Sequence, residues 1–144
     1  MNPHDLPVHE IPALSGNNAP IHSEDIFTDM EVIGEVPKDL NGLYVRNGPN
    51  PYFQPDWRYH AFDGDGMLHA VKFENGKVTY RNRYIQTKGL QAEMEAGRSL
   101  WAGLMADPAL SERTGWGAHG SLKDSSSTDV VVHAGRALTT FYQC

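Results

Sequence analysis

The chain has 144 residues, of which 40% are hydrophobic and 21% charged, a composition typical of a globular domain with its own core. The formal net charge of −6 argues against nucleic acid as a partner, because phosphate contacts need clustered lysine and arginine. No apolar run approaches the roughly 20 residues of a membrane-spanning helix, and the first residues lack the basic start and apolar stretch of a secretory signal. The one cysteine, Cys144, excludes an internal disulfide and fits a cytoplasmic location.

The N-terminal part of the chain contains an arm and two predicted strands. Residues 1–24 are rich in Pro, Asn, His and Gly and have no periodicity, which predicts an extended arm ahead of a domain over residues 25–144. Residues 29–36 alternate in polarity and end at a proline, which predicts a short edge strand. Residues 42–46 predict the next strand, and the Asn-Gly-Pro-Asn-Pro run after them predicts its end.

The middle of the chain gives the strongest local signal, a β-hairpin. Residues 68–73 and 78–85 alternate in polarity, and Asn75-Gly76 lies between them at the tip. Two alternating runs around Asn-Gly are typical of a hairpin with a tight two-residue turn.

One helix and two more strands are predicted after the hairpin. Leu90, Met94, Gly97, Trp101 and Leu104 are spaced as one helical face, which predicts a short helix over residues 88–104. Residues 106–128 predict a loop, and residues 129–133 and 137–142 predict strands. The fold class is therefore all-β with one short helix. The last strand reaches the C-terminus without a stop signal, so we expect a truncated chain.

The residues that could carry chemistry form no local site. The histidines have neither the spacing of a helical metal motif nor a Cys-x-x-Cys pair beside them (His4, His9, His22, His60, His69, His119 and His133). The Asp-Gly-Asp-Gly run at residues 63–66 fails as an EF-hand, because Met67 and Leu68 stand at the fifth and sixth positions. A turn in which the aspartates bind nearby backbone amides is the better interpretation. The aromatic residues between Tyr44 and Tyr84 suit a core, or the wall of a site for a long apolar molecule.

Five stretches together resemble the carotenoid cleavage oxygenase family (42–51, 60–67, 80–87, 93–97 and 131–136). Arg-Asn-Gly-Pro-Asn-Pro followed by Phe-Asp-Gly-Asp-Gly-Met is a specific pair of motifs. The likeness covers about residues 25–142. It implies that the chain is the N-terminal part of a seven-bladed β-propeller with Fe(2+) on its axis, held by histidines and oriented by outer glutamates. In this family the metal and dioxygen convert one conjugated C=C bond into two carbonyl products.

The resemblance places the iron ligands outside this chain. The family's first iron-binding histidine lies downstream of Cys144, and none of the seven histidines present occupies a ligand position. We therefore expect neither a metal ligand nor a catalytic residue here, and expect the fragment alone to be inactive. Tyr142 falls where an outer glutamate is usual, which bears on iron affinity in the longer protein.

The resemblance also identifies three candidate substrate-binding residues. Phe62 lies in the Asp-Gly motif and is expected on the cavity wall, with simple packing as an equal alternative. Leu104 and Phe141 take the places of a tyrosine and a lysine that hold the phenol in stilbene-cleaving members. An unpaired buried phenol costs about 1–3 kcal/mol, so these residues favour an apolar polyene or apocarotenoid.

Two alternatives stay open: a stilbene-cleaving dioxygenase of the same family, and a non-catalytic β-propeller that binds apolar ligands. The expected partners are a polyene and O2. Because such substrates partition into lipid, peripheral membrane contact is also open.

Overall fold

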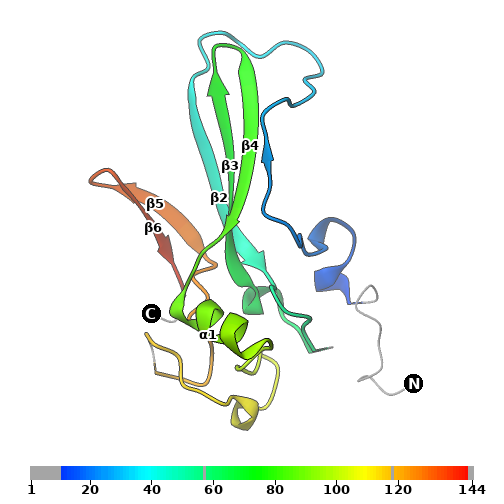
Figure 1. Ribbon diagram of the computed structural model, residues 1–144, viewed down its shortest axis with the longest axis vertical. Coiled ribbons are helices and arrows are strands. Elements are labelled where there is room, and N and C mark those ends of the chain that lie inside the picture. The colour runs from blue at the N-terminus through cyan, green and yellow to red at the C-terminus, as the bar shows by residue number, and fades with distance from the viewer. Residues whose placement is uncertain (1–10, 57, 118, 143–144) are drawn as a thin grey trace.

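A long antiparallel sheet dominates the computed structural model, which describes residues 11–56, 58–117 and 119–142. The sheet order is β1-β4-β3-β2, and a separate hairpin is formed by β5 and β6. Figure 1 shows the sheet extending upward from a lower end that helix α1 and several loops enclose. The strands and helix are β1 (Ile26–Phe27), β2 (Gly42–Asn50), β3 (Asp65–Glu74), β4 (Lys77–Tyr84), α1 (Lys88–Ala96), β5 (Asp129–His133) and β6 (Arg136–Thr140). Short 3-10 turns occur at Pro12–Leu14, Gly16–Asn18, Ala61–Asp63 and Pro108–Leu110. The prediction of a sheet-rich chain with one short helix is confirmed.

The β3–β4 hairpin is the centre of the sheet and has the predicted tip. Asn75 and Gly76 both have positive φ, 52° and 78°, as a two-residue hairpin turn requires. Glu74 pairs with Lys77, and the register continues down to Met67 opposite Tyr84. The hairpin prediction is therefore confirmed, although β3 begins earlier than predicted.

Strand β2 passes through the predicted stop. It continues to Asn50, and Pro49 pairs with Gly66 across the sheet. β2 is one of the two edge strands of this sheet, and an edge strand needs no N–H on its open side, so it tolerates a proline there. The prediction that residues 47–51 end the strand is wrong except at its last position.

The predicted edge strand over residues 29–36 is wrong. The edge strand beside β4 is β1, where Phe27 pairs with Tyr80 and their rings stack at 5.9 Å. Residues 29–36 form bends instead, with Gly34 at a φ of 98° that a regular strand does not adopt. Met30, Val32 and Ile33 are exposed, Ile33 to 97%, and Val36 is only partly buried, so the alternation reflects no buried face.

Helix α1 is shorter than the predicted helix over 88–104. Thr87 caps its start, because the side-chain oxygen accepts a hydrogen bond from the Leu90 amide at 3.1 Å. Gly97 adopts a left-handed conformation and ends it at Ala96. Trp101 and Leu104 therefore lie in the following loop, and the prediction of a helix beyond Ala96 is wrong.

The β5–β6 hairpin matches its prediction with shifted ends. His133 pairs with Arg136 around a two-residue turn, in which Ala134 and Gly135 have positive φ. Strand β6 ends at Thr140, so Phe141 lies beyond it.

Two buried asparagines fasten the N-terminal arm to the sheet. The Asn82 carboxamide donates to the Ser23 carbonyl at 2.8 Å and accepts from the Asp25 amide at 2.7 Å. Asn50 binds Ile21 in the same two-way manner, at 2.9 Å and 2.8 Å. The extended arm over residues 1–24 stays a prediction, because residues 1–10 lie outside the described residues and 3-10 turns occur at Pro12–Leu14 and Gly16–Asn18. Residues 19–24 have no helix or strand.

Replacing Asn82 with alanine should release the arm. The change leaves the Ser23 carbonyl and the Asp25 amide without their partners, at a cost of about 1–3 kcal/mol. We expect faster hydrogen exchange at the Asp25 amide and lower resistance to urea. Asn41→Ala is the control, because Asn41 also makes two hydrogen bonds but is exposed. Equal effects of the two substitutions would contradict this role.

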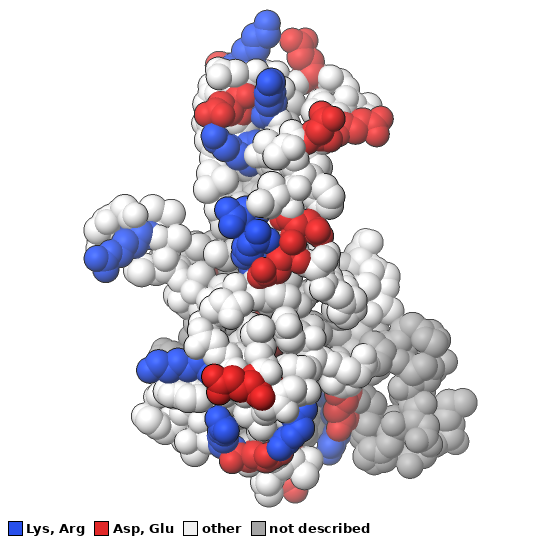
Figure 2. Space-filling view, in the orientation of Figure 1, with Lys and Arg blue, Asp and Glu red and all other residues white. Residues whose placement is uncertain are grey.

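The buried core lies at the lower end of the sheet. Met67, Tyr84 and Leu90 join β3, β4 and α1 there. Figure 2 shows acidic and basic side chains side by side at the upper end of the sheet and again around its lower end. No helix in the described ranges has both the length and the apolar character to cross a bilayer.

Candidate functional site

A cavity of about 310 Å³ opens at the lower end of the sheet, between the start of β3, α1 and the loops after them. Its lining includes four aromatic residues, called the aromatic wall below: Tyr59, Phe62, Trp101 and Phe141. It also includes charged residues, called the charged wall below, among them Asp63, Asp65, Glu93 and Lys123. The cavity therefore combines apolar contact area with a strongly polar side, which is the usual make-up of a small-molecule site.

Asp63 joins two loops of this cavity. One carboxylate oxygen accepts from the His60 amide at 2.9 Å, and the other accepts from the Leu104 amide at 2.7 Å. His60 in turn accepts from the Phe62 amide, which completes a capping box around the turn. The prediction that the aspartates bind nearby backbone amides is confirmed for Asp63, and the Leu104 bond adds a partner from a distant loop. Asp65 instead accepts from the Tyr52 amide, 13 residues away, at 3.1 Å.

The two glycines of the motif allow the chain to pass between neighbours. A Cβ at Gly64 would lie 2.6 Å from the Asn50 amide nitrogen and 2.7 Å from the Tyr59 hydroxyl. A Cβ at Gly66 would lie 2.5 Å from the Ser126 carbonyl oxygen. After the capped turn at Ala61–Asp63, the two glycines therefore let the chain pack closely against Asn50 and the Ser125–Ser126 loop.

A buried ionic cluster, formed by Lys123, Asp65 and Glu93, lies beside this segment. The ammonium contacts Asp65 Oδ1 at 2.7 Å and Glu93 Oε2 at 2.6 Å, and the three side chains are only 11%, 4% and 2% exposed. Asp65 Oδ1 takes no hydrogen bond beyond this ion pair, while Glu93 Oε1 accepts from the Leu100 amide at 2.8 Å. Burial works to lower the pKa of Lys123, but the two carboxylates outweigh it and raise that pKa above its ordinary value.

Two tyrosines beside the cluster stay protonated far into the alkaline range. Burial is the main cause that raises the pKa of Tyr84 to about 12, against a hydrogen bond from Asn50 that lowers it. Burial also raises the pKa of Tyr59 well above its usual range, with Asp63 and Asp65 adding to the effect. Both hydroxyls therefore serve as neutral hydrogen-bonding groups and not as bases at neutral pH.

The structure brings two of the three candidate substrate-binding residues together. Phe62 and Phe141 both line the cavity, and Tyr142 lies between them, with its ring 5.6 Å and 4.6 Å from theirs. Leu104 contributes its backbone amide to Asp63, but its side chain is exposed and is not among the lining residues. That these residues bind substrate stays a prediction.

The charged wall was missed by the sequence interpretation. Glu93 carried a signal, because it lies three residues after Leu90 and so shares the buried face of α1. Lys123 carried none, since it lies in a loop and reaches its partners across the fold.

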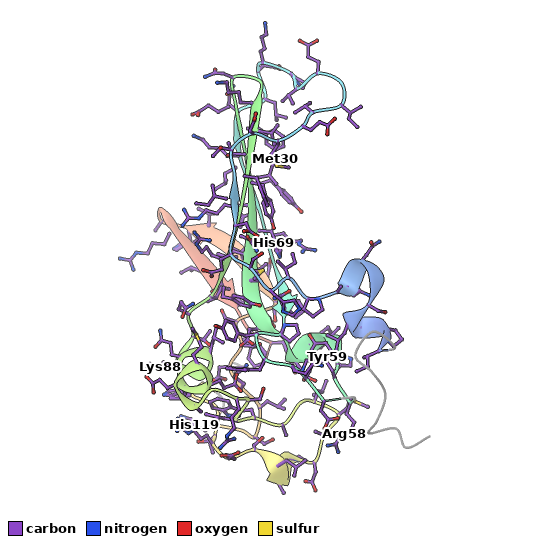
Figure 3. The ribbon with its side chains drawn as sticks, turned by 45° about the vertical axis from the view of Figure 1, so that its right-hand side comes forward. Met30, Arg58, Tyr59, His69, Lys88 and His119 are labelled. Carbon is purple, nitrogen blue, oxygen red and sulfur yellow. The ribbon has the colours of Figure 1, made fainter. Side chains whose placement is uncertain are left out.

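The histidines of the described ranges form no cluster with other possible metal ligands. Figure 3 shows His69 midway along the sheet and His119 near α1 at the lower end. His69 instead bonds the Tyr80 hydroxyl at 2.8 Å, and burial together with Arg46 lowers its pKa. Within residues 11–56, 58–117 and 119–142, no three His, Cys, Asp or Glu side chains are grouped to hold a metal ion. His4 and His9 lie outside the described residues.

The fold is similar to those of solved oxygenase structures. The lignostilbene dioxygenase of Pseudomonas brassicacearum matches with a TM-score of 0.70 and 29% identity, over 92% of this chain and 27% of that one. A Synechocystis apocarotenoid oxygenase mutant, Glu150Gln in its own numbering, matches with a TM-score of 0.67 and 27% identity, over 85% of this chain and 26% of that one.

The sequence comparisons identify the family more specifically than the structural ones do. The model of the Retinal pigment epithelial membrane protein family matches residues 18–143, so the chain belongs to that family. The probable carotenoid cleavage dioxygenase 4 of Arabidopsis thaliana is 53% identical over 85 residues, which are 58% of this chain and 14% of that protein. A carotenoid cleavage oxygenase of Mycobacterium tuberculosis is 39% identical over 129 residues, 88% of this chain and 23% of that protein. The chain thus spans less than a quarter of these relatives' length, and the predicted family resemblance is confirmed.

Proposed function

We propose that this chain is the N-terminal part of a non-haem Fe(2+) dioxygenase that cleaves a conjugated C=C bond of a carotenoid or apocarotenoid with O2. The observation that carries this proposal is the family match over residues 18–143, together with relatives named for carotenoid cleavage. The products are two carbonyl compounds. We place the protein in the cytoplasm, with contact to a membrane surface during substrate uptake.

The same family membership supports a seven-bladed propeller for the longer protein. A four-stranded antiparallel sheet, the unit of a propeller blade, is present here as β1 to β4. The remaining blades belong to the longer protein.

The described residues of this chain hold no group of side chains that could bind the iron of the proposed enzyme. The residues described here do not fit the metal, because they contain no cluster of ligating side chains. We propose that histidines downstream of this chain hold it, and we derive no step of the reaction through it.

What this chain contributes is part of the substrate's surroundings. Phe62 and Phe141 provide aromatic contact area to a hydrocarbon chain and keep water from it. Leu104, at the edge of the same region, adds apolar surface once its loop is covered.

A stilbene substrate is the second candidate, supported by the match to the lignostilbene dioxygenase structure. The apolar side chains at positions 104 and 141 disfavour it, because neither offers a hydrogen bond to a phenol.

The test uses the full-length protein that contains this chain, loaded with Fe(2+) and given either an apocarotenal or a hydroxystilbene. We expect aldehyde products from the apocarotenal, detected by mass spectrometry, with the metal-free protein as control. Faster cleavage of the stilbene would overturn the substrate assignment, and no cleavage of either substrate would overturn the enzymatic assignment.

The 144-residue chain alone should not retain stoichiometric Fe(2+) after desalting.

A further inference from the structure

The cavity wall holds more negative charge than its cations neutralise. Among the residues that the structure describes, five carboxylates and two cationic side chains line it. Two of the carboxylates, Asp56 and Glu112, pair with Arg58 and Arg98. The charge that remains unbalanced therefore belongs to Asp63 and to the buried cluster.

The cluster itself has one negative charge in excess. Lys123 supplies one positive charge to Asp65 and Glu93, which are both almost fully buried. Asp65 Oδ1 takes no hydrogen bond beyond its ion pair with Lys123 at 2.7 Å, so no neutral donor adds to the dispersal of that charge. In surroundings with little water, such a charge acts on neighbouring groups with little screening.

Asp63 adds a second negative charge to the same wall. Its partners are the backbone amides of His60 and Leu104, and among the described residues no ion pair joins it to a cation. Amide hydrogen bonds stabilise the carboxylate but leave its net charge in place.

We propose that this cavity accepts the neutral end of a polyene, bearing a hydroxyl or an aldehyde, and rejects the same polyene when it ends in a carboxylate. The aromatic wall supplies contact area to either molecule. A carboxylate brought within about 10 Å of an excess negative charge at an effective dielectric constant of about 20 binds roughly tenfold more weakly. A hydroxyl meets no such penalty and can donate to a wall rich in carboxylate oxygens. This inference rests on the proposed polyene substrate, and it makes Asp63, Asp65 and Glu93 determinants of specificity.

The test compares three ligands of equal chain length: an apocarotenal, the corresponding apocarotenoic acid, and the methyl ester of that acid. Binding to the metal-free full-length protein is followed by quenching of tryptophan fluorescence, because Trp101 lines the cavity. The ester matches the acid in size but has no charge. We expect the acid to bind at least about tenfold more weakly than the ester. Equal or tighter binding of the acid, or no binding of any of the three ligands, would overturn the proposal.

A variant that removes one negative charge tests whether the buried cluster causes the weaker binding of the acid. Glu93→Gln leaves Lys123 and Asp65 as a neutral pair and should narrow the ratio between acid and ester. Glu95→Gln is the control, because it makes the same change on the exposed side of α1 and lies outside the cavity. If near-UV circular dichroism shows that Glu93→Gln does not fold, Asp63→Asn takes its place. An unchanged ratio in the folded variant would contradict the role of this wall.

Cleavage assays keep this inference apart from the proposed function. Discrimination between acid and ester without cleavage of the apocarotenal would overturn the proposed function alone. Cleavage of the apocarotenal together with equal affinity for acid and ester would overturn the inference alone.

Discussion

Lys123→Met is expected to lower the free energy of unfolding by about 3–5 kcal/mol, the cost of leaving a buried charge without its partner. Here the substitution strands two carboxylates at once, because Asp65 and Glu93 both depend on the same ammonium. A loss of this size is a large fraction of the 5–15 kcal/mol typical of a domain. Urea denaturation followed by circular dichroism measures it directly.

Two further variants separate charge from packing. Lys72→Met removes an exposed ion pair with Glu74, whose side chains are 52% and 61% exposed, so it should change stability by less than about 1 kcal/mol. Adding Glu93→Gln and Asp65→Asn to Lys123→Met removes the stranded charges and should recover part of the loss. If the triple variant were no more stable than Lys123→Met, the cluster would matter through its packing alone.

The parts of the fold that sequence predicted correctly are those fixed by neighbours in the chain. The tip of the β3–β4 hairpin needs two residues that tolerate positive φ, and Asn75-Gly76 supplies both. The predictions of element ends were wrong where the local sequence pattern was overridden, either by the backbone conformation of a glycine or by the position of a strand in the sheet. Gly97 ended a helix whose apolar spacing continued, and Pro49 was accepted because β2 lies at an edge.

The candidate site was predictable only in part, because most of its residues come together through tertiary packing. Phe62 and Phe141 were assigned through the family resemblance, and the structure places both on one cavity. The charged wall depends on pairing between α1, the start of β3 and the loop that contains Lys123. No spacing rule connects these segments, because their contact exists only after the sheet and helix have packed.

Gly66→Ala is expected to disrupt that packing at its closest point. The added Cβ would lie 2.5 Å from the Ser126 carbonyl oxygen and 2.9 Å from that of Ser125, and a backbone cannot yield as a flexible side chain does. The Gly66 amide also donates to the Ser125 carbonyl at 2.9 Å, so separating the segments weakens this bond too. Overpacking of this kind costs about 3 kcal/mol.

The matched control lies on the neighbouring strand. Gly48 pairs with Met67, one position beyond Gly66, and a Cβ there would meet nothing within 4 Å. Gly48→Ala should therefore be neutral or slightly stabilising, because alanine has less conformational freedom to lose on folding. Thermal unfolding compares the two variants, and hydrogen exchange at the Gly66 amide reports on the local contact. If Gly66→Ala were as stable as Gly48→Ala, the loop containing Lys123 could move away from Gly66 without a loss of stability. The charged wall of the cavity would then not be rigid, and the proposed substrate discrimination depends on that rigidity.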